Sequence, residues 1–337
     1  MIISHTHESE QIMERTTQLR LFIRLCGLIL TLGAASLTAW YCIPHTYASA
    51  STHAEKKQRC ASANASYSSL VHQFDYNAKA SLQVKEISVT QQDEVSIHDI
   101  TYVSEDHIVS AYLVVPTGQG PFAGALFMHW LDDSPTGNRD EFLQDAITLA
   151  HKGTISLLPQ GFYPWITPPT NSAKDCEATI QQTIALRRGL DLLVSTTTID
   201  PQRIAFVGHD YGAMYGSILA GIDKRIKAAV LMAPTARFSN WNVPFFLDTL
   251  TARQRLDYTV DTASIDPITL MEYVSPTPVL FQYGRLDKYV SLADLNNLVE
   301  VAKDPTTIKL YATDHALADD LSHQDRLNWL ETELKLP

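Results

Sequence analysis

The stretch Arg203–Gly221, RIAFVGHDYGAMYGSILAG, is an apolar run followed by a glycine-bracketed turn and a series of small residues. We predict a buried strand, a sharp turn and a helix in immediate succession. The turn GHDYG has the spacing Gly-x-nucleophile-x-Gly, with Asp210 where that motif has serine. Gly208 and Gly212 suit a turn that brings strand and helix too close for side chains. The alternative is an ordinary strand-to-helix turn in which Asp210 caps the helix.

Apolar runs and helical patterns alternate on both sides of this stretch. Strands are predicted at Gly124–Trp130, Thr154–Pro159, Lys227–Met232, Val279–Tyr283 and Thr307–Tyr311. Helices are predicted at Arg139–His151, Asp175–Ser195, Ser291–Ala302 and Ser322–Leu336. Val95–Ser104 and Ile108–Val115 alternate apolar and polar residues, which predicts two antiparallel edge strands. The pattern predicts an α/β fold with a mostly parallel central sheet and helices on both faces.

The length of 337 residues, 45% of them hydrophobic, suits one catalytic domain with an N-terminal appendage. We expect residues 1–50 to be a signal peptide or N-terminal membrane anchor. Residues 51–90 are expected to form a linker and a loosely attached arm. The main domain is then 91–337, with a short cap insertion at about 234–277.

The first fifty residues contain the apolar segment Leu21–Ile43, within which the run Leu25–Ile43 is long enough to span a bilayer. Tyr47–Ala50 follows with the small-x-small pattern of a signal-peptidase site. The sequence therefore indicates a protein that is exported, periplasmic or secreted, or anchored in the membrane by this segment. Two of the four cysteines lie inside the apolar segment. Cys60 and Cys176 remain beyond it and either pair in an oxidising compartment or are unrelated.

The charge pattern excludes some classes of function. The net charge is −11, and no stripe of Lys and Arg is present, which argues against a nucleic-acid surface. No Gly-rich phosphate loop is found. His129 has no partner at ligand spacing, so no metal site and no cofactor are implied.

Two further residues follow the GHDYG turn in a meaningful order. Asp287 lies in FQYGRLDKYV, just after the strand predicted at Val279–Tyr283. His315 lies in LYATDHAL, after the last predicted strand. From Val95 onward the chain resembles the α/β-hydrolase family, within it the dienelactone-hydrolase-like and acyl-peptidase-like group. GHDYG itself is similar to the elbow of haloalkane dehalogenases and epoxide hydrolases, whose nucleophile is an aspartate.

The resemblance implies a hydrolase that acts on a small molecule through an Asp210–His315–Asp287 triad. Asp210, ionised without the help of a base, forms an ester with the substrate. His315, held by Asp287, then activates water that hydrolyses the ester. The family positions for the oxyanion-stabilising backbone N–H groups fall on Tyr211 and on Leu131 or Trp130.

Five further residues are candidates for the substrate pocket: His129, His209, Trp165, Tyr258 and Tyr273. The two tyrosines lie in the cap insertion, where they either donate to an epoxide oxygen or only pack. The sequence leaves open whether the substrate is an epoxide, a halide, an ester or a peptide. Two alternatives also remain open: a non-catalytic envelope binding protein that keeps the fold, and an esterase or peptidase-like hydrolase with an altered nucleophile.

Overall fold

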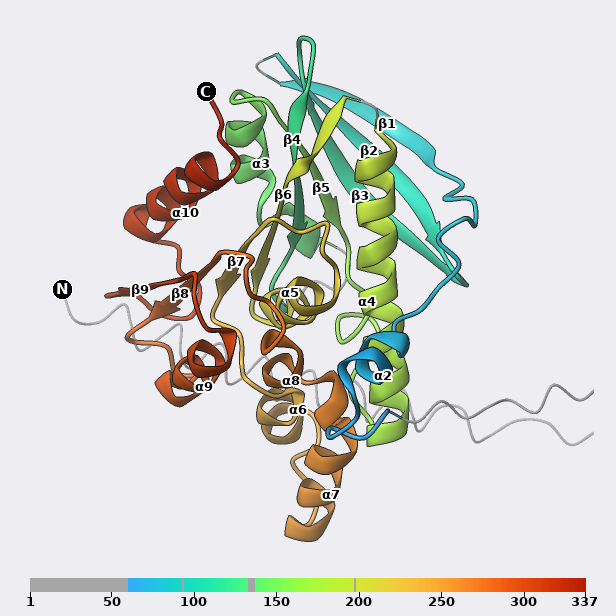
Figure 1. Cartoon of the computed structure of the whole chain (residues 1–337), viewed down its shortest axis with the longest axis vertical. Helices are drawn as coiled ribbons and strands as arrows, with labels where there is room; N and C mark the ends of the chain where they lie inside the picture. Colours follow the sequence, from blue (N-terminus) through green and yellow to red (C-terminus); the bar gives the residue numbers. More distant parts are fainter. Residues whose placement is uncertain (1–59, 93, 133–136, 197) are drawn as a thin grey trace, which may run out of the picture. The chain divides into compact units, whose positions relative to one another are not determined.

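The computed structural model describes residues 60–92, 94–132, 137–196 and 198–337 (Figure 1). These residues belong to one compact unit that begins at Lys57. The expected signal peptide or anchor at residues 1–50 lies outside the described residues. Within the described part of the chain, no helix combines the length and the hydrophobicity needed to cross a bilayer.

A nine-stranded sheet forms the centre of this unit, in the order β1-β2-β3-β5-β4-β6-β7-β8-β9. The first strands are β1 (Lys85–Gln92), β2 (Val95–Ser104), β3 (His107–Pro116), β4 (Phe122–Met128) and β5 (Thr154–Pro159). The others are β6 (Ile199–His209), β7 (Ala228–Met232), β8 (Val279–Gly284) and β9 (Thr306–Tyr311). The β1–β2, β2–β3 and β3–β5 pairs are antiparallel and all the others are parallel. The sheet is therefore mostly parallel, as predicted.

Helices cover both faces of the sheet (Figure 1). Before the elbow the chain forms α2 (Tyr67–His72), η2 (Asn138–Asp140), α3 (Leu143–Ala150) and α4 (Ser172–Ser195). After it come α5 (Tyr211–Ile222), α9 (Leu292–Ala302) and α10 (Asp320–Glu333). The helices α3 and α10 contact each other on one face, and α4 and α5 pack together on the other. Every residue of β4, β5, β7 and β8 is buried, which explains why their sequences are mostly apolar.

The insertion between β7 and β8 is helical. It contains α6 (Phe238–Phe245), α7 (Ala252–Thr262), η3 (Ala263–Ile265) and α8 (Pro267–Met271). A capping box starts α7: Thr251 accepts from the Gln254 backbone N–H, and the Gln254 side chain accepts from that of Thr251. The α6 helix packs against α7 and lies beside the elbow helix through ring contacts of Phe238 with Tyr211 and Tyr215.

The arm expected over residues 51–90 differs from the prediction where it is described. Leu70 and Phe74 are buried in the main core rather than loosely attached. Residues 85–90 begin β1, so the outer edge strand of the sheet is β1 and not β2. All eight residues of β1 are exposed. Residues 86–90 do alternate polar and apolar side chains, but Ile87 and Val89 are exposed, and this segment falls within the predicted arm.

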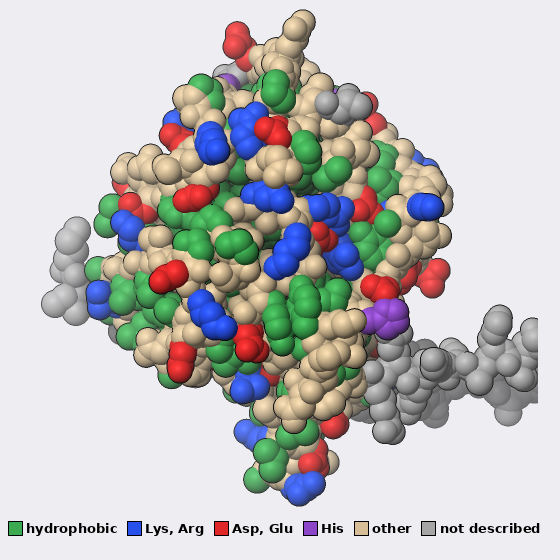
Figure 2. All heavy atoms as spheres, in the orientation of Figure 1, with side chains coloured by type: hydrophobic (Ala, Val, Ile, Leu, Met, Phe, Trp, Pro, Cys, Tyr) green, Lys and Arg blue, Asp and Glu red, His purple; other side chains and the backbone are tan. Residues whose placement is uncertain are grey.

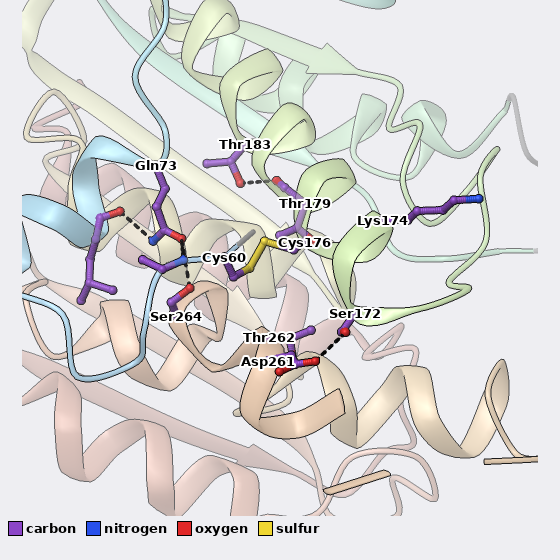
Figure 3. The surroundings of a disulfide bond; sticks show 12 residues. Cys60, Gln73, Ser172, Lys174, Cys176, Thr179, Thr183, Asp261, Thr262 and Ser264 are labelled. Atoms are coloured by element: carbon purple, nitrogen blue, oxygen red, sulfur yellow. Dashed lines mark hydrogen bonds between the residues drawn. A yellow bond between two sulfur atoms is a disulfide. The ribbon is translucent and has the colours of Figure 1, made fainter. Parts of the chain in front are cut away.

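A disulfide between Cys60 and Cys176 joins the start of the arm to α4 (Figure 3). Beside it, the Gln73 side-chain oxygen accepts from the Ala61 backbone N–H at 2.9 Å and from the Ser264 hydroxyl at 3.0 Å. The arm is therefore fixed to both α4 and the cap insertion.

Replacing both cysteines with serine is expected to lower the free energy of unfolding by about 2–5 kcal/mol. The bond closes a loop with a sequence separation of 116, and its loss releases that loop in the unfolded chain. Urea unfolding of the double variant and the wild type measures the difference. Equal midpoints for the oxidised wild type and the variant would contradict this role.

Candidate active site

The elbow places Asp210 between β6 and α5 in a strained conformation. Its φ is 55° and its ψ is −119°, a region that residues other than glycine rarely adopt. A Cβ on Gly212 would lie 2.0 Å from the Met128 carbonyl oxygen, and one on Gly208 would lie 2.4 Å from that of Gly212. Only glycine fits at these two positions, as the sequence indicated. The strained turn projects one carboxylate from the carboxyl end of the sheet.

His315 and Asp287 meet at the same end of the sheet. The His315 Nδ1 lies 2.8 Å from the Asp287 Oδ2. The other oxygen of Asp287 accepts backbone N–H bonds from Tyr289 and Val290 at 2.8 and 3.0 Å. Burial alone would raise the pKa of Asp287, but the His315 hydrogen bond and charge together with these backbone bonds lower it. Asp287 is thus an ionised, fixed acceptor that orients His315.

The second ring nitrogen of His315, Nε2, is buried and makes no hydrogen bond with any of the described residues. Burial lowers the pKa of His315, but the Asp287 hydrogen bond and the charge of Asp210 outweigh it, so the pKa is raised. An unpaired buried imidazole nitrogen beside two carboxylates is suited to accept a proton from a bound molecule.

The Asp210 carboxylate is 1% exposed and is held by the backbone. Its Oδ2 accepts the Leu131 backbone N–H at 3.1 Å. Burial raises its pKa, whereas the charges of His315 and His209 and the backbone N–H groups of Leu131 and Tyr211 lower it. Two backbone donors, one directly after the elbow residue and one after β4, thus converge on this side chain.

Similarity to known proteins lies in structure and not in sequence. No family model and no curated protein sequence matches the chain. An acetyl xylan esterase from Paenibacillus sp. R4 superposes with a TM-score of 0.62 at 19% identity, covering 79% of this chain and 91% of its own. Acetyl xylan esterase 1 from Thermoanaerobacterium sp. JW/SL YS485 gives 0.63 at 13% identity, covering 78% and 92%. A protein assigned as a dienelactone hydrolase from Klebsiella pneumoniae subsp. pneumoniae MGH 78578 gives 0.51 at 15%, covering 69% and 95%.

The chain has the α/β-hydrolase fold. The fold class predicted from the elbow and the alternating elements is therefore confirmed. These similarities do not extend to the identity of the nucleophile, so the roles of individual α/β-hydrolase site residues rest on the geometry described here.

Trp130 differs from its predicted role in this α/β-hydrolase site. Its backbone N–H donates to the Glu141 Oε2 at 2.6 Å and so does not face Asp210. Of the two alternatives after β4, Leu131 is the one whose N–H reaches the elbow side chain. The Trp130 ring instead stacks on His209, with centroids 5.3 Å apart, and lies 6.4 Å from the His315 ring.

His129 and Trp165 support the loop after β4. The Nδ1 of His129 faces the Trp130 carbonyl oxygen at 2.9 Å, and its Nε2 accepts the Gly161 backbone N–H at 2.9 Å. Burial lowers the pKa of His129 to about 4. The Trp165 indole N–H also donates to the Trp130 carbonyl, at 2.8 Å. The two ring nitrogens of His129 and the indole N–H of Trp165 all hydrogen-bond to backbone groups of the protein. These side chains therefore fix the loop and offer no hydrogen bond to a substrate.

Tyr258 and Tyr273, for which the sequence left open donation to an epoxide or packing, both make contacts within the protein. The Tyr258 hydroxyl accepts from Asn242 at 2.8 Å and donates to Asp175 at 2.7 Å in a buried network. Asn242 also accepts the Tyr211 hydroxyl at 2.5 Å, so the network ties the residue after Asp210 to the cap. Tyr273 stacks on Tyr67 of the arm, with ring centroids 4.3 Å apart, and belongs to that contact.

Three residues near His315 were not predicted from the sequence. Trp241 of α6 stacks on the His315 ring at 5.6 Å, and Tyr289 meets it edge-on at 5.4 Å. Glu141 lies between the Trp130 backbone and His209. Tyr289 follows Asp287 by two residues, a proximity that could have indicated it. The other two come from separate helical segments, and no local pattern marks them.

A cavity of about 690 Å³ lies beside the site, on the side of Trp130, Glu141 and Met232. Neither Asp210 nor His315 lines it. Its wall also contains Asp140 at the end of η2, Asp320 at the start of α10, and the His323–Asp145–Arg326 group. Among the described residues, no cluster of His, Cys, Asp and Glu could hold a metal ion.

Proposed function

We propose that the protein is a hydrolase in which Asp210 forms a covalent ester with the substrate and His315 activates the water that hydrolyses it. The observation that carries this proposal is the convergence of three groups at one point. Asp210 sits on a strained elbow, the Leu131 N–H binds its carboxylate, and His315 keeps a buried free Nε2. Backbone strain of this kind costs free energy, so it persists only where the surrounding structure enforces it, and such residues cluster at active sites.

The first step is an in-line attack by an Asp210 oxygen on a substrate carbon. The new C–O bond forms as the old bond breaks, and the electron pair leaves with a halide or stays on the opened epoxide oxygen, which then takes up a proton from solvent. In the second step His315 takes a proton from water, and the hydroxide attacks the Asp210 carbonyl carbon. The Leu131 and Tyr211 N–H groups stabilise the resulting oxyanion. Collapse breaks the bond to the substrate oxygen, which takes its proton back from His315 and leaves as the alcohol. Asp210 is left as a carboxylic acid, and it becomes a carboxylate again by releasing its proton to solvent.

A carboxylate nucleophile favours alkyl electrophiles over acyl substrates. Attack of Asp210 on an ester carbonyl would produce an anhydride, a more reactive species than the ester itself, whereas attack on an alkyl carbon produces an ordinary ester. The acetyl xylan esterases to which the fold is similar are named for an acyl substrate. We therefore propose alkyl halides or epoxides as the substrates of this protein. An acetyl ester serves as the comparison substrate in the experiment below.

The aromatic side chains next to His315 support an apolar substrate. Trp241, Phe245 and Tyr289 contact one another with ring centroids 4.8–6.0 Å apart. Phe245 is 42% exposed and Tyr289 47%, so the series runs from the surface to the imidazole. Exposed apolar groups arranged around a reactive centre are typical of a binding surface for an alkyl or aryl group.

The His315→Gln variant is expected to stop after the first step and accumulate an ester on Asp210. The wild type and the variant are incubated with 1-bromobutane, styrene oxide and p-nitrophenyl acetate, and digested peptides are weighed by mass spectrometry. We expect a butyl or hydroxyphenylethyl adduct on the peptide that contains Asp210, while the wild type turns over the same compound.

The double variant Asp210→Ala with His315→Gln is the control and should carry no adduct. An adduct elsewhere, or turnover of the nitrophenyl ester alone, would favour the esterase alternative. If none of the three compounds reacts, the proposed chemistry is overturned and the binding-protein alternative gains.

Hydrolysis of the ester intermediate is expected to increase with pH and then level off. His315 acts only when neutral, and the Asp287 hydrogen bond and the Asp210 charge raise its pKa. Once Asp210 is esterified its charge is lost, so the His315 pKa governing the second step is lower than in the free enzyme. Single-turnover rates across pH, compared with the His315 titration followed by NMR, measure this difference. A kinetic pKa at or above that of the free enzyme would contradict it.

We also propose that the protein is exported or anchored by its N-terminal segment. The Cys60–Cys176 disulfide supports this proposal, because such bonds persist in oxidising compartments. On the face shown in Figure 2, Lys and Arg side chains lie among Asp, Glu and hydrophobic side chains. Cell fractionation of the full chain, with N-terminal sequencing of the product, distinguishes cleavage near Ala50 from retention in the membrane and from a cytoplasmic protein.

A further inference from the structure

Two buried histidines lie next to Trp130, and their hydrogen bonds differ in kind. His129 is 2% exposed and His209 is 0% exposed. The His129 ring has one oxygen acceptor, the Trp130 carbonyl, and one N–H donor, that of Gly161. A neutral imidazole with its proton on Nδ1 satisfies both partners. His129 therefore needs no charge.

The His209 ring faces two acceptors. Its Nδ1 lies 2.6 Å from the Glu141 Oε1, and its Nε2 lies 2.9 Å from the His315 carbonyl oxygen. A neutral imidazole has a single N–H, so one ring nitrogen would direct its lone pair at an oxygen. Only the imidazolium donates to both. The side chain of Glu141 balances its charge within hydrogen-bond distance.

We propose that His209 is held permanently as an imidazolium and acts through Asp210, keeping the adjacent nucleophile ionised in a buried site. The first half of this proposal stands on hydrogen-bond geometry alone. The second half rests on the proposed function of Asp210. His209 is thus a positioning residue: it precedes the nucleophile and does not itself meet the substrate.

A second cation near Asp210 matters because His315 is not charged at every pH. Asp210 is 1% exposed, and its burial favours the uncharged acid. His315 counters this burial only while it carries a proton, and it loses that proton as the pH rises through its pKa. The charge of His209 also acts on Asp210 in the direction that lowers its pKa. A cation that never takes part in proton transfer keeps Asp210 ionised in both protonation states of His315.

The described contacts of the His209 ring come from Glu141, Trp130 and His315. Glu141, between η2 and α3, binds Nδ1, and the backbone of the His315 loop binds Nε2. The Trp130 ring stacks on its face at 5.3 Å, and the His315 ring lies at 5.2 Å. Glu141 is the only one of these side chains that bears a negative charge, apart from Asp210 on the elbow itself.

The first test is an NMR measurement of histidine ring nitrogens in the full, resting chain between pH 6 and 8. Signals are assigned from His209→Gln and His129→Gln spectra. We expect His209 to carry protons on both ring nitrogens throughout this range and His129 on one. A singly protonated His209 at pH 7 would overturn the proposal, and this result does not depend on whether the protein is an enzyme.

The second test uses Glu141→Gln, whose amide oxygen still accepts a hydrogen bond while the negative charge is removed. We expect His209 to become neutral and ester formation on Asp210 to slow by about tenfold or more at neutral pH. The acid limb of its pH dependence should move to higher pH. Asp140→Asn is the matched control, because it removes one exposed carboxylate from the adjacent position and should change neither quantity.

Unfolding curves of both variants are recorded in parallel. A purely structural role for Glu141 would lower stability and the amount of active enzyme without moving the acid limb. That outcome, with His209 still doubly protonated in the wild type, would overturn the electrostatic half of the proposal and leave the protonation state intact.

Discussion

Asp210→Ala should lower turnover by at least about four orders of magnitude, because the covalent step loses its nucleophile and the remaining groups cannot replace it. His315 and Asp287 should keep their 2.8 Å hydrogen bond in this variant, because the Tyr289 and Val290 backbone N–H groups hold Asp287 independently of Asp210. The Leu131 N–H, by contrast, loses its acceptor. Initial rates with the substrate identified by the adduct experiment measure the loss.

Asp287→Asn is the informative control for this variant. It removes the charge that orients and stabilises protonated His315 but leaves the nucleophile in place. Ester formation should continue while ester hydrolysis slows, so Asp287→Asn accumulates adduct and Asp210→Ala does not. Residual turnover of Asp210→Ala within tenfold of the wild type would remove Asp210 from the mechanism.

Asp210→Ser tests whether the site is otherwise built for acyl transfer. The serine would restore the residue that the elbow motif normally contains. If this variant hydrolyses p-nitrophenyl acetate faster than the wild type, the backbone donors and His315 are competent for that chemistry. The aspartate alone would then account for the altered reaction.

Gly212→Ala is expected to destabilise the fold by more than about 4 kcal/mol, the range of exceptional single substitutions. The added Cβ would meet the Met128 carbonyl oxygen at 2.0 Å and the His129 carbonyl oxygen at 2.7 Å. Both obstacles are backbone atoms of the segment that carries the Leu131 N–H, so they cannot swing aside as a side chain would. Thermal unfolding followed by circular dichroism measures the effect.

Gly124→Ala in β4 is the matched control. Its nearest contacts would be Ile199 and Ile204 side-chain atoms at 3.4 Å, an ordinary packing distance. We expect a change within about 1 kcal/mol. If Gly212→Ala unfolds at the temperature of the wild type, the close approach of α5 to the β4 loop is not what requires glycine there.

The sequence revealed most of the sheet because its strands are buried on both faces. The prediction at Thr154–Pro159 coincides with β5, and Val95–Ser104 coincides with β2. Continuous or alternating hydrophobicity survives as a local signal in such strands. β1 buries no side chain and its alternation is limited to residues 86–90, so the sequence predicted it as part of the arm, although its backbone pairs with β2 over its whole length.

The order of strands also placed the acid and the histidine. Asp287 and His315 each follow a strand that ends at the edge where Asp210 lies, and parallel strands bring their carboxyl ends together. The choice between Trp130 and Leu131 could not be made in this way. It depends on Glu141, whose carboxylate takes the Trp130 N–H through the packing of a helix start eleven positions along the chain.

Side chains from the cap were the least predictable. Trp241 lies against His315, whereas Tyr273 lies against Tyr67. Both are aromatic residues of one insertion, and only the packing of α6 and α8 decides which of them faces the catalytic end of the sheet. Composition indicates that such rings will be buried, but not where they go.

The bond from the Leu131 N–H to the Asp210 carboxylate has a consequence for chemical probes. Phosphonate and boronate reagents for serine hydrolases bind by placing their own oxygen against the backbone amides beside the nucleophile. In this protein the Asp210 carboxylate already accepts the hydrogen bond of one such amide, that of Leu131. The elbow offers such reagents no hydroxyl to modify, and its Leu131 amide already has an acceptor. Profiling methods based on them would pass over this hydrolase fold, whereas alkylating epoxides and halides address the group that it presents.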